Sequence, residues 1–420
     1  MLNRSFKAPL FLIGTHFCAD DSDLPKPVEF IPPTTELREL VERARGRNAK
    51  LNITGVLLAK GNDVLQILEG SEESVVKLFH TIREDKRHSG VVELLRDYGP
   101  RRRFENVGML LFDLQMQSPK EVLQSVLRYS KLESYLTSDD RVFKFIQTFI
   151  TGKRPAPSGA RYTPDKWTLS TETLPFGEHL GLIVGQTCQF ALQPIVEPSE
   201  GKISSLEALI RGNDGGSPEH FFSTVNPDNV YEVDLQTKAY AFALAEKLGI
   251  GSHKIAVNLL PMSLVNVPGA VEFLVNQIKK HGLQPEQVVI EVTENEMISG
   301  FNQFNSAIKQ LRGEGIGLAI DDFGSGYAGL SLLTRFQPDK IKIDREIVSN
   351  IHLSGPKQAI VRSIISCCSD LEITLVAEGI EKIEEWCWLE SAGIRRFQGF
   401  LFARPQLNGV GDIYWPHLVR

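Results

Sequence analysis

The run Leu318-Ala319-Ile320-Asp321-Asp322-Phe323-Gly324-Ser325-Gly326-Tyr327 leads an apolar segment directly into two adjacent aspartates and a glycine-rich loop. The apolar part predicts a buried strand, so the aspartates would lie at its C-terminal end. Adjacent carboxylates are costly to hold together unless a cation neutralises them, and two divalent cations can share one carboxylate. The run therefore predicts a metal site at a strand end, with a solvated acidic loop as the alternative.

This predicted strand is one of a series in the second half of the chain, where short apolar runs alternate with helix-patterned segments. Such alternation is typical of a βα barrel or a doubly wound sheet. The predicted strands are Phe190–Val196, Ser205–Ile210, Ile255–Leu259, Val288–Val292, Leu318–Ile320, Lys340–Ile343, Ile373–Val376 and Phe397–Phe402. Because eight strands close a barrel of the TIM type, we predict an α/β TIM-type barrel.

Most of these strands carry a polar side chain at or near the C-terminal end. These side chains are Asn258, Glu291, Asp321, Lys342, Glu378 and Gln398. In a barrel the C-terminal strand ends meet at one mouth, so residues far apart in the chain become neighbours around a substrate.

Oxygen atoms dominate the predicted ligand set, which favours magnesium or manganese over zinc. One cation would be held by Glu207, Asn258, Glu291 and Asp321, and a second by Asp321, Asp322 and Glu378. Two such cations lower the pKa of a shared water and neutralise phosphate oxygens, so the implied reaction is phosphodiester hydrolysis. Lys342 would orient that water and balance the negative charge that develops on the phosphate. The candidate catalytic residues are therefore Lys342 and two of the cation ligands, Glu207 and Glu378.

The first part of the chain follows a different pattern, with two amphipathic helices among short β-rich runs. The order is a strand at 10–13, a helix at 37–44, strands at 53–58 and 64–68, a helix at 75–82, and strands at 91–95 and 107–114. This βαββαββ order predicts an α+β sandwich of ferredoxin-like type. Ser118 and Pro119 then begin a further helix at 122–129.

Glycine and proline interrupt every periodic pattern shortly after residue 151, which indicates a linker. We therefore predict a first domain at 8–105, its helical extension at 106–150, a linker at 151–180 and the barrel domain at 181–420.

Bulk composition excludes some classes of function. The net charge of −6 gives no basic field for a nucleic-acid polymer. The five cysteines are odd in number and form no C-x-x-C pair, which favours reduced thiols. No apolar run approaches the length of a bilayer span, and the apolar part of the N-terminus is too short for a secretory signal. We expect a cytoplasmic protein with no membrane partner.

The segment Leu206-Glu207-Ala208-Leu209-Ile210-Arg211 contains the signature of the EAL-domain cyclic di-GMP phosphodiesterases, and roughly residues 182–405 resemble this family. The other matching motifs are Gln193-Pro194-Ile195-Val196, Asn258, Glu291-Val292-Thr293-Glu294, Asp321–Gly324, Lys340–Asp344, Ala377–Gly379 and Gln398–Phe400. The resemblance implies a barrel that linearises cyclic di-GMP to pGpG with two divalent cations. It also implies that Gln193, Arg211 and Gln398 bind the substrate, and that Glu294 anchors the loop at 322–329.

No position of the metal set departs from the EAL pattern, which favours catalysis over binding alone. The alternative is a catalytically silent EAL domain that acts as a cyclic di-GMP receptor or a protein-interaction module. From the same resemblance we expect a homodimer through the EAL domain and a regulatory protein partner.

Residues 8 to about 150 resemble a BLUF domain, the blue-light sensor that uses FAD, followed by its C-terminal helices. The matching segments are Arg47-Asn48, Ile53–Leu58, Leu65–Gly70, Asp85–His88 and Gly108-Met109. The resemblance implies that Asn48 and Gln66 hydrogen-bond the flavin ring. It places Arg87 and His88 near the pocket or the polar tail of the flavin.

One position departs from the BLUF pattern. The family's first strand ends in a tyrosine that donates an electron and a proton to the excited flavin, and Gly14 stands at that position here. The first tyrosine of the chain is Tyr98. We therefore expect a BLUF fold without tyrosine-dependent light chemistry that keeps a regulatory or dimerising role. FAD is either retained through Asn48 and Gln66 or lost, and substitute chemistry at His16 or mediated by a tryptophan is the alternative for light sensing.

Overall fold

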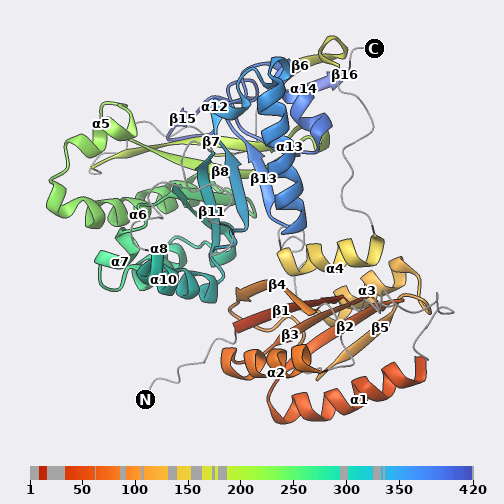
Figure 1. Cartoon of the computed structure of the whole chain (residues 1–420). Coiled ribbons are helices and arrows are strands. Elements are labelled where there is room, and N and C mark those ends of the chain that lie inside the picture. The colour runs from red at the N-terminus through yellow and green to blue at the C-terminus, as the bar shows by residue number, and fades with distance from the viewer. Residues whose placement is uncertain are drawn as a thin grey trace. The chain divides into compact units, whose positions relative to one another are not determined.

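The structure is a computed structural model that describes residues 9–16, 34–61, 63–85, 91–105, 108–130, 140–152, 163–172, 176–177, 187–293, 301–324, 333 and 336–418. The chain divides into two compact units, residues 1–154 and 155–420. Each unit has its own set of helices and strands (Figure 1). Each also has its own buried hydrophobic residues.

The first unit is built on a five-stranded sheet in the order β4-β1-β3-β2-β5. Its elements are β1 (Pro9–His16), α1 (Thr34–Lys50), β2 (Thr54–Lys60), β3 (Asp63–Glu69), α2 (Glu72–Glu84), β4 (Val91–Tyr98), β5 (Leu110–Asp113), α3 (Pro119–Tyr129) and α4 (Arg141–Thr151). The predicted βαββαββ order and the α+β sandwich are confirmed. The predicted third helix is α3, which Ser118 and Glu121 begin with a capping box.

Two cores cover the two faces of this sheet. Side chains of successive strand residues point to opposite faces, so Leu65 and Ile67 pack with α3 and α4. Val64 and Leu68 pack on the other face with residues of α1 and α2. Gln66 lies two residues from both Val64 and Leu68 along β3, so its side chain points to the same face of the sheet, toward α1 and α2.

The second unit contains the predicted eight-stranded barrel, which is closed because β14 pairs with β7. The strands are β7 (Gln189–Glu197), β8 (Lys202–Arg211), β9 (Lys254–Asn258), β10 (Val288–Thr293), β11 (Gly317–Phe323), β12 (Lys340–Ile343), β13 (Thr374–Ala377) and β14 (Arg396–Phe397). The TIM-type barrel is confirmed with one difference. Strand β7 runs antiparallel to both of its barrel neighbours, whereas β8 to β14 are parallel.

Helices surround the barrel strands in Figure 1. They are α5 (Pro218–Ser223), α6 (Val230–Leu248), α7 (Ser263–Asn266), α8 (Ala270–Lys280), α10 (Phe301–Glu314), α12 (Arg345–Val348), α13 (Gly355–Asp370) and α14 (Ile383–Ala392). None of the helices in the described ranges has both the length and the apolar character needed to cross a bilayer.

A small apolar layer lies beneath the polar mouth of the barrel. Ala256, Val289 and Ala319 are buried together. Each stands two residues before a polar residue of the same strand, so the strand period directs both to the barrel interior. The small layer fills the narrow interior and supports Asn258, Glu291 and Asp321 above it.

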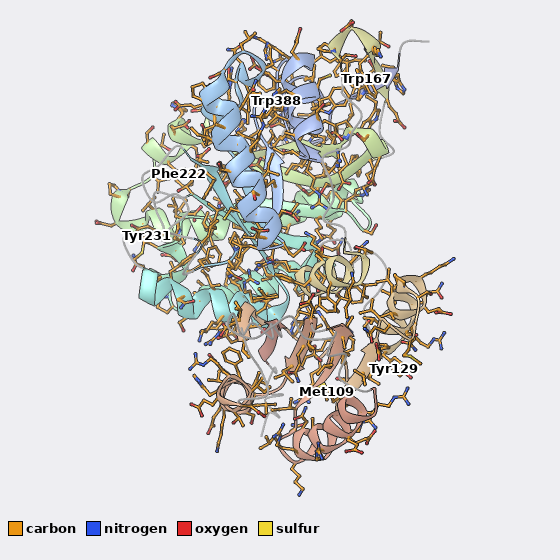
Figure 2. The ribbon with its side chains drawn as sticks, turned by 45° about the vertical axis from the view of Figure 1, so that its right-hand side comes forward. Met109, Tyr129, Trp167, Phe222, Tyr231 and Trp388 are labelled. Carbon is orange, nitrogen blue, oxygen red and sulfur yellow. The ribbon has the colours of Figure 1, made fainter. Side chains whose placement is uncertain are left out.

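The predicted linker at 151–180 contains a strand that the sequence analysis missed. Residues Trp167–Glu172 form β6, which pairs antiparallel with β16 (Ile413–Leu418) at the other end of the barrel domain. Trp167, labelled in Figure 2, stacks edge-on against Trp386 with ring centroids 5.0 Å apart. The partner strand β16 lies far away in the sequence, so the local pattern of glycine and proline residues could not indicate that residues 167–172 form a strand. A short strand, β15 (Gln406–Leu407), also pairs with β7.

Candidate active site

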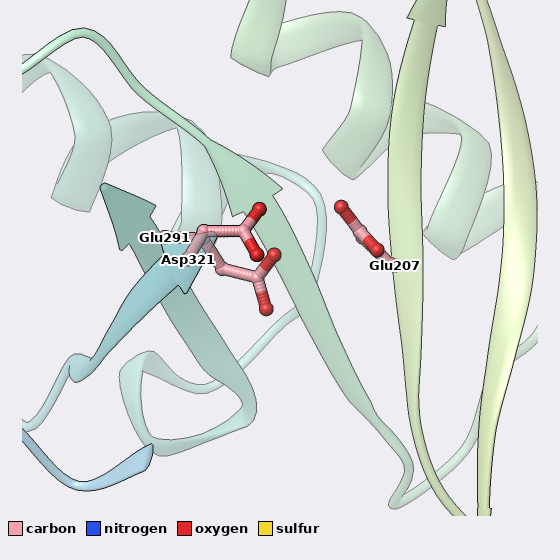
Figure 3. Close-up of side chains that lie close together, drawn as sticks. All are labelled: Glu207, Glu291 and Asp321. Carbon is pink, nitrogen blue, oxygen red and sulfur yellow. The ribbon is translucent and has the colours of Figure 1, made fainter. Parts of the chain in front are cut away.

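The structure brings the candidate residues of the barrel strands together at one mouth. Three of them are carboxylates that point toward one another from β8, β10 and β11 (Figure 3). They are Glu207, Glu291 and Asp321. Asn258 ends β9, Lys342 lies in β12, and Glu378 follows β13 directly.

The acidic side chains form two groups of the kind that hold metal ions. Glu207, Glu291 and Asp321 each offer an oxygen atom within 4.8 Å of the others, and so do Asp321, Asp322 and Glu378. Asp321 belongs to both groups. This is the division that the sequence analysis predicts for two cations, and the assignment of each group to a cation stays a prediction.

A single buried ammonium lies among these carboxylates. Lys342 Nζ is 2.6 Å from Glu378 Oε1, 2.7 Å from Glu291 Oε2, 3.1 Å from Asp321 Oδ1 and 3.2 Å from Glu207 Oε2. Its side chain is 1% exposed. Burial opposes the charged form, but the carboxylates outweigh burial and raise the pKa of Lys342 well above its usual value. Four carboxylates surround one ammonium, so the cluster has a surplus of negative charge when they are ionised.

The carboxylates differ in how well they are stabilised. Burial tends to raise the pKa of Glu207, yet Lys342 and hydrogen bonds from Gln398 and Asn258 outweigh burial and lower it. For Glu291, burial and repulsion from neighbouring carboxylates prevail over the attraction of Lys342, and its pKa is raised well above the usual value. Glu207 is thus preorganised as an anion, whereas Glu291 would be stabilised as an anion by an added cation.

A distortion of β11 brings the two adjacent aspartates into one pocket. Successive side chains of a regular strand point to opposite faces. Here the β11–β12 register shifts between Ile320 and Phe323, and Asp322 has a left-handed backbone with φ 52°. Burial and the nearby carboxylates of Asp321 and Asp344 raise the pKa of Asp322 to about 6. Left-handed aspartates are strained and are found preferentially at functional sites.

A pocket of about 320 Å³ opens above these groups. Gln193 and Gln398 line it, and Gln398 Nε2 donates to Gln193 Oε1 at 2.9 Å and to Glu207 Oε2 at 2.7 Å. Arg211 ends β8 outside this lining, and its Nη1 donates to the Ile210 carbonyl at 2.8 Å. Glu294, the predicted loop anchor, lies outside the described residues.

Seven lining residues were not predicted as site residues, and four of these carry charged or aromatic side chains. These four are Asp344, Arg345, Glu381 and Phe400. All four lie within a few residues after the end of a barrel strand. That position in the sequence could have identified them as candidate site residues.

In the first unit, two of the candidate flavin contacts are buried. Asn48 Nδ2 donates to the Gly108 carbonyl at 3.1 Å, while Asn48 Oδ1 is buried without a hydrogen-bond partner among the described residues. Gln66 Nε2 lies 4.0 Å from the sulfur of Met109, which Figure 2 labels. The two carboxamides therefore lie at the edge of the core beneath α1 and α2. Arg87 and His88 lie outside the described residues.

The strand register locates Gly14 relative to Gln66. Gly14 of β1 pairs with Leu65, and Ile13 pairs with Gln66. The position across from Gln66 in β1 is therefore taken by isoleucine, and Gly14 stands one residue further along the strand.

Comparison with known proteins identifies both units. The EAL domain family matches residues 182–405, and the family described as sensors of blue-light using FAD (BLUF) matches residues 29–110. The BLUF match begins after β1 and so leaves out the strand that carries Gly14.

Two similar proteins match almost the whole chain, and a third matches 57% of it. The chain is 44% identical over 388 residues to the "Blue light- and temperature-regulated antirepressor BluF" of Escherichia coli K12, covering 91% of this chain and 96% of that protein. The structure of Klebsiella pneumoniae BlrP1 with manganese and cyclic di-GMP at pH 6 matches with a TM-score of 0.60 and 48% identity, covering 98% of this chain and 100% of BlrP1. A standalone EAL protein of Vibrio cholerae in its cyclic di-GMP-bound form matches with a TM-score of 0.51 and 33% identity, covering 57% of this chain and 97% of that protein. The chain therefore belongs to the EAL domain family and joins its EAL domain to an N-terminal BLUF domain.

Proposed function

We propose that this protein hydrolyses cyclic di-GMP to linear pGpG with two divalent cations, under the control of its BLUF domain. The observation that carries the proposal is the pair of carboxylate groups that share Asp321 around Lys342 at the barrel mouth. Manganese and cyclic di-GMP are both named for the similar BlrP1 structure, which supports the same ligands here.

The residues of the mouth fit a pair of magnesium or manganese ions. The donor atoms of the two groups are carboxylate oxygens, which these hard cations prefer. The carboxylate surplus around Lys342 is also what bound cations would neutralise. Glu207, Asn258, Glu291 and Asp321 would hold one ion, and Asp321, Asp322 and Glu378 would hold the other.

The chain's own residues would position the reaction. Bound cations supply Lewis acidity, which makes water a better nucleophile at neutral pH and neutralises phosphate oxygens. Lys342 keeps its proton because of the surrounding carboxylates, so it can donate a hydrogen bond to the attacking water and stabilise negative charge that develops on phosphate. Gln398 and Asn258 hold Glu207 through hydrogen bonds of 2.7 Å each. Gln193 fixes Gln398 in turn, so this side of the site is rigid before substrate arrives.

A silent EAL domain that binds cyclic di-GMP or a protein partner is the second candidate. The name antirepressor, carried by a relative that matches almost the whole chain, favours this alternative. Incubating the purified chain with cyclic di-GMP and Mg²⁺ or Mn²⁺, and separating the nucleotides by chromatography, tests the two. Appearance of pGpG supports hydrolysis, whereas binding without a product supports the receptor.

We further propose a homodimer through the EAL domain, a regulatory protein partner, a cytoplasmic location and the domain boundaries given above. Light scattering of the full chain and of residues 155–420, the second compact unit with β6 included, tests the dimer. A dimer of the full chain that becomes a monomer on removal of residues 1–154 would contradict an EAL interface.

We infer that the BLUF domain holds a flavin through Asn48 and Gln66. Among the described residues Asn48 Oδ1 has no hydrogen-bond partner, which supports this, because a buried acceptor without a donor is costly unless a ligand supplies one. The planar ring of FAD carries such a donor next to its carbonyl groups. The Gln66 amide is buried on the same face, and its contact within the described part of the chain is a long one, 4.0 Å to the Met109 sulfur.

The absorption spectrum of the freshly purified protein should show bound flavin that does not shift to longer wavelength under blue light. Gly14 offers no redox-active side chain, and the residue that pairs with Gln66 is an isoleucine. Spectra recorded in darkness and during illumination check this. Asn48→Ala should reduce the flavin content, and a reversible red shift of the wild-type flavin would show that another residue replaces the tyrosine.

A further inference from the structure

The rim of the candidate active site carries an arginine with no role so far. Arg345 begins α12, three residues after Lys342, and lines the same pocket. Its side chain is 59% exposed, whereas that of Lys342 is 1% exposed. Among the described residues that line the pocket, Arg345 is thus the cation that a solvent-borne ligand can reach.

Two contacts hold Arg345 across the mouth. Its Nη2 lies 2.8 Å from Glu381 Oε1. Its aliphatic stem covers Gly379, where an added Cβ would lie 2.5 to 2.8 Å from Arg345 Cγ, Cβ and Cδ. Gly379 also has φ 63°, so a larger residue is excluded there by both space and backbone. The guanidinium therefore lies at the pocket, with its Nη2 facing Glu381.

The remaining lining is strongly acidic, which creates a problem for an anionic substrate. Six carboxylates line the pocket, namely Glu207, Asp321, Asp322, Asp344, Glu378 and Glu381. Cyclic di-GMP has two phosphodiesters, and the proposed cations can act on one of them at a time. Lys342 is enclosed by carboxylates and cannot reach the second. An exposed cation at the rim would offset the repulsion, and the guanidinium fork matches phosphate oxygens in shape.

We propose that Arg345 binds the phosphodiester of cyclic di-GMP that is not being cleaved, with Glu381 as the residue that positions its guanidinium. This inference rests on the proposed function, because it takes the same pocket and the same substrate. It adds a substrate contact that acts on affinity, separate from the groups around Lys342.

Calorimetric titration of the full chain with two nucleotides in Ca²⁺ tests the proposal without depending on turnover. Cyclic di-GMP has two phosphates, and the dinucleotide GpG keeps both guanines but has one. Arg345→Gln should raise the Kd for cyclic di-GMP about 10- to 100-fold, the range of a lost charged hydrogen bond, and that for GpG less than about threefold. Arg345→Lys should recover part of the loss, because it restores charge without the fork. Glu381→Gln should weaken cyclic di-GMP binding less than Arg345→Gln does.

A matched control is Arg362→Gln, an arginine of α13 that packs over Trp388 and does not line the pocket. It should leave both affinities unchanged. Equal weakening of both nucleotides by Arg345→Gln would mean that Arg345 contacts guanine or acts through the scissile site, and would overturn the proposal, as would no weakening at all. Hydrolysis by the wild type is measured separately: binding without hydrolysis overturns the phosphodiesterase while leaving Arg345 intact, and absence of cyclic di-GMP binding overturns both.

Discussion

Replacing Glu207 by alanine should lower the rate of cyclic di-GMP hydrolysis by about a thousandfold or more, because several kcal/mol of cation-dependent charge stabilisation would be lost. Glu207 is buried. Its carboxylate accepts hydrogen bonds from Asn258 Nδ2 and Gln398 Nε2 and forms an ion pair with the Lys342 ammonium. Its removal takes away one ligand of the first proposed cation and also releases the side chains that hold this wall of the pocket. Chromatographic measurement of pGpG under substrate saturation checks the effect on kcat.

The barrel should remain folded in this variant, since the buried Lys342 ammonium keeps Glu291, Asp321 and Glu378 as partners. Circular dichroism and thermal unfolding verify that. Glu272→Ala removes an exposed acid of α8 outside the pocket and serves as the matched control, with wild-type activity expected. Near-normal hydrolysis by a folded Glu207→Ala protein would contradict the two-cation assignment.

The barrel could be predicted from the sequence because each strand is a local run of residues buried on both faces. The direction of a strand relative to its neighbours could not be predicted in this way. The run at 190–196 has the same apolar character as its neighbours, and nothing in that character tells an antiparallel β7 from a parallel one. The pairing of β6 with β16 also escaped, because it joins the two ends of the second unit. Local patterns report burial, whereas strand partners depend on the whole fold.

Residues of the candidate site could be predicted where a charged or polar side chain stands near the C-terminal end of a predicted strand. Asp321 and Lys342 lie near the C-terminal ends of buried strands and gave a clear signal. Arg345 and Glu381 lie in the segments after the strands, where no periodicity marks which side chains turn toward the pocket. In the first unit, alignment placed Gly14 at the tyrosine position, but only the register showed that Ile13 pairs with Gln66.

A second large effect is expected for Lys342→Met, on stability as well as on hydrolysis. The change leaves four carboxylates without the ammonium that lies within 3.2 Å of each. Removing one partner of a buried ion pair costs about 3 to 5 kcal/mol of unfolding free energy. All four tryptophans of the chain lie in residues 155–420, so their fluorescence follows unfolding of the barrel unit during a urea titration.

The loss of stability should depend on pH. Burial and neighbouring carboxylates already hold the pKa values of Glu291 and Glu378 well above the usual range, and removal of Lys342 should raise them further. A carboxyl group whose pKa is higher in the folded state than in the unfolded chain favours folding while it is protonated. As the pH rises above the pKa of the unfolded chain, the same group progressively destabilises the folded state. The Lys342→Met protein should therefore be closest to the wild type at about pH 5 and furthest from it at about pH 8, where the unfolded carboxylates are fully ionised.

Metal ions provide the decisive comparison for this variant. If the mouth binds divalent cations, Mg²⁺ or Mn²⁺ should restore much of the stability that Lys342→Met loses in EDTA, because ligand binding to the folded state raises its free energy of unfolding. Lys238→Met is the matched control: Lys238 is buried and pairs with Asp234 at 2.6 Å, away from the pocket. It should also destabilise the barrel, but without rescue by metal. Equal responses of the two variants to Mn²⁺ would mean that the cluster around Lys342 is a structural ion-pair network rather than a cation site.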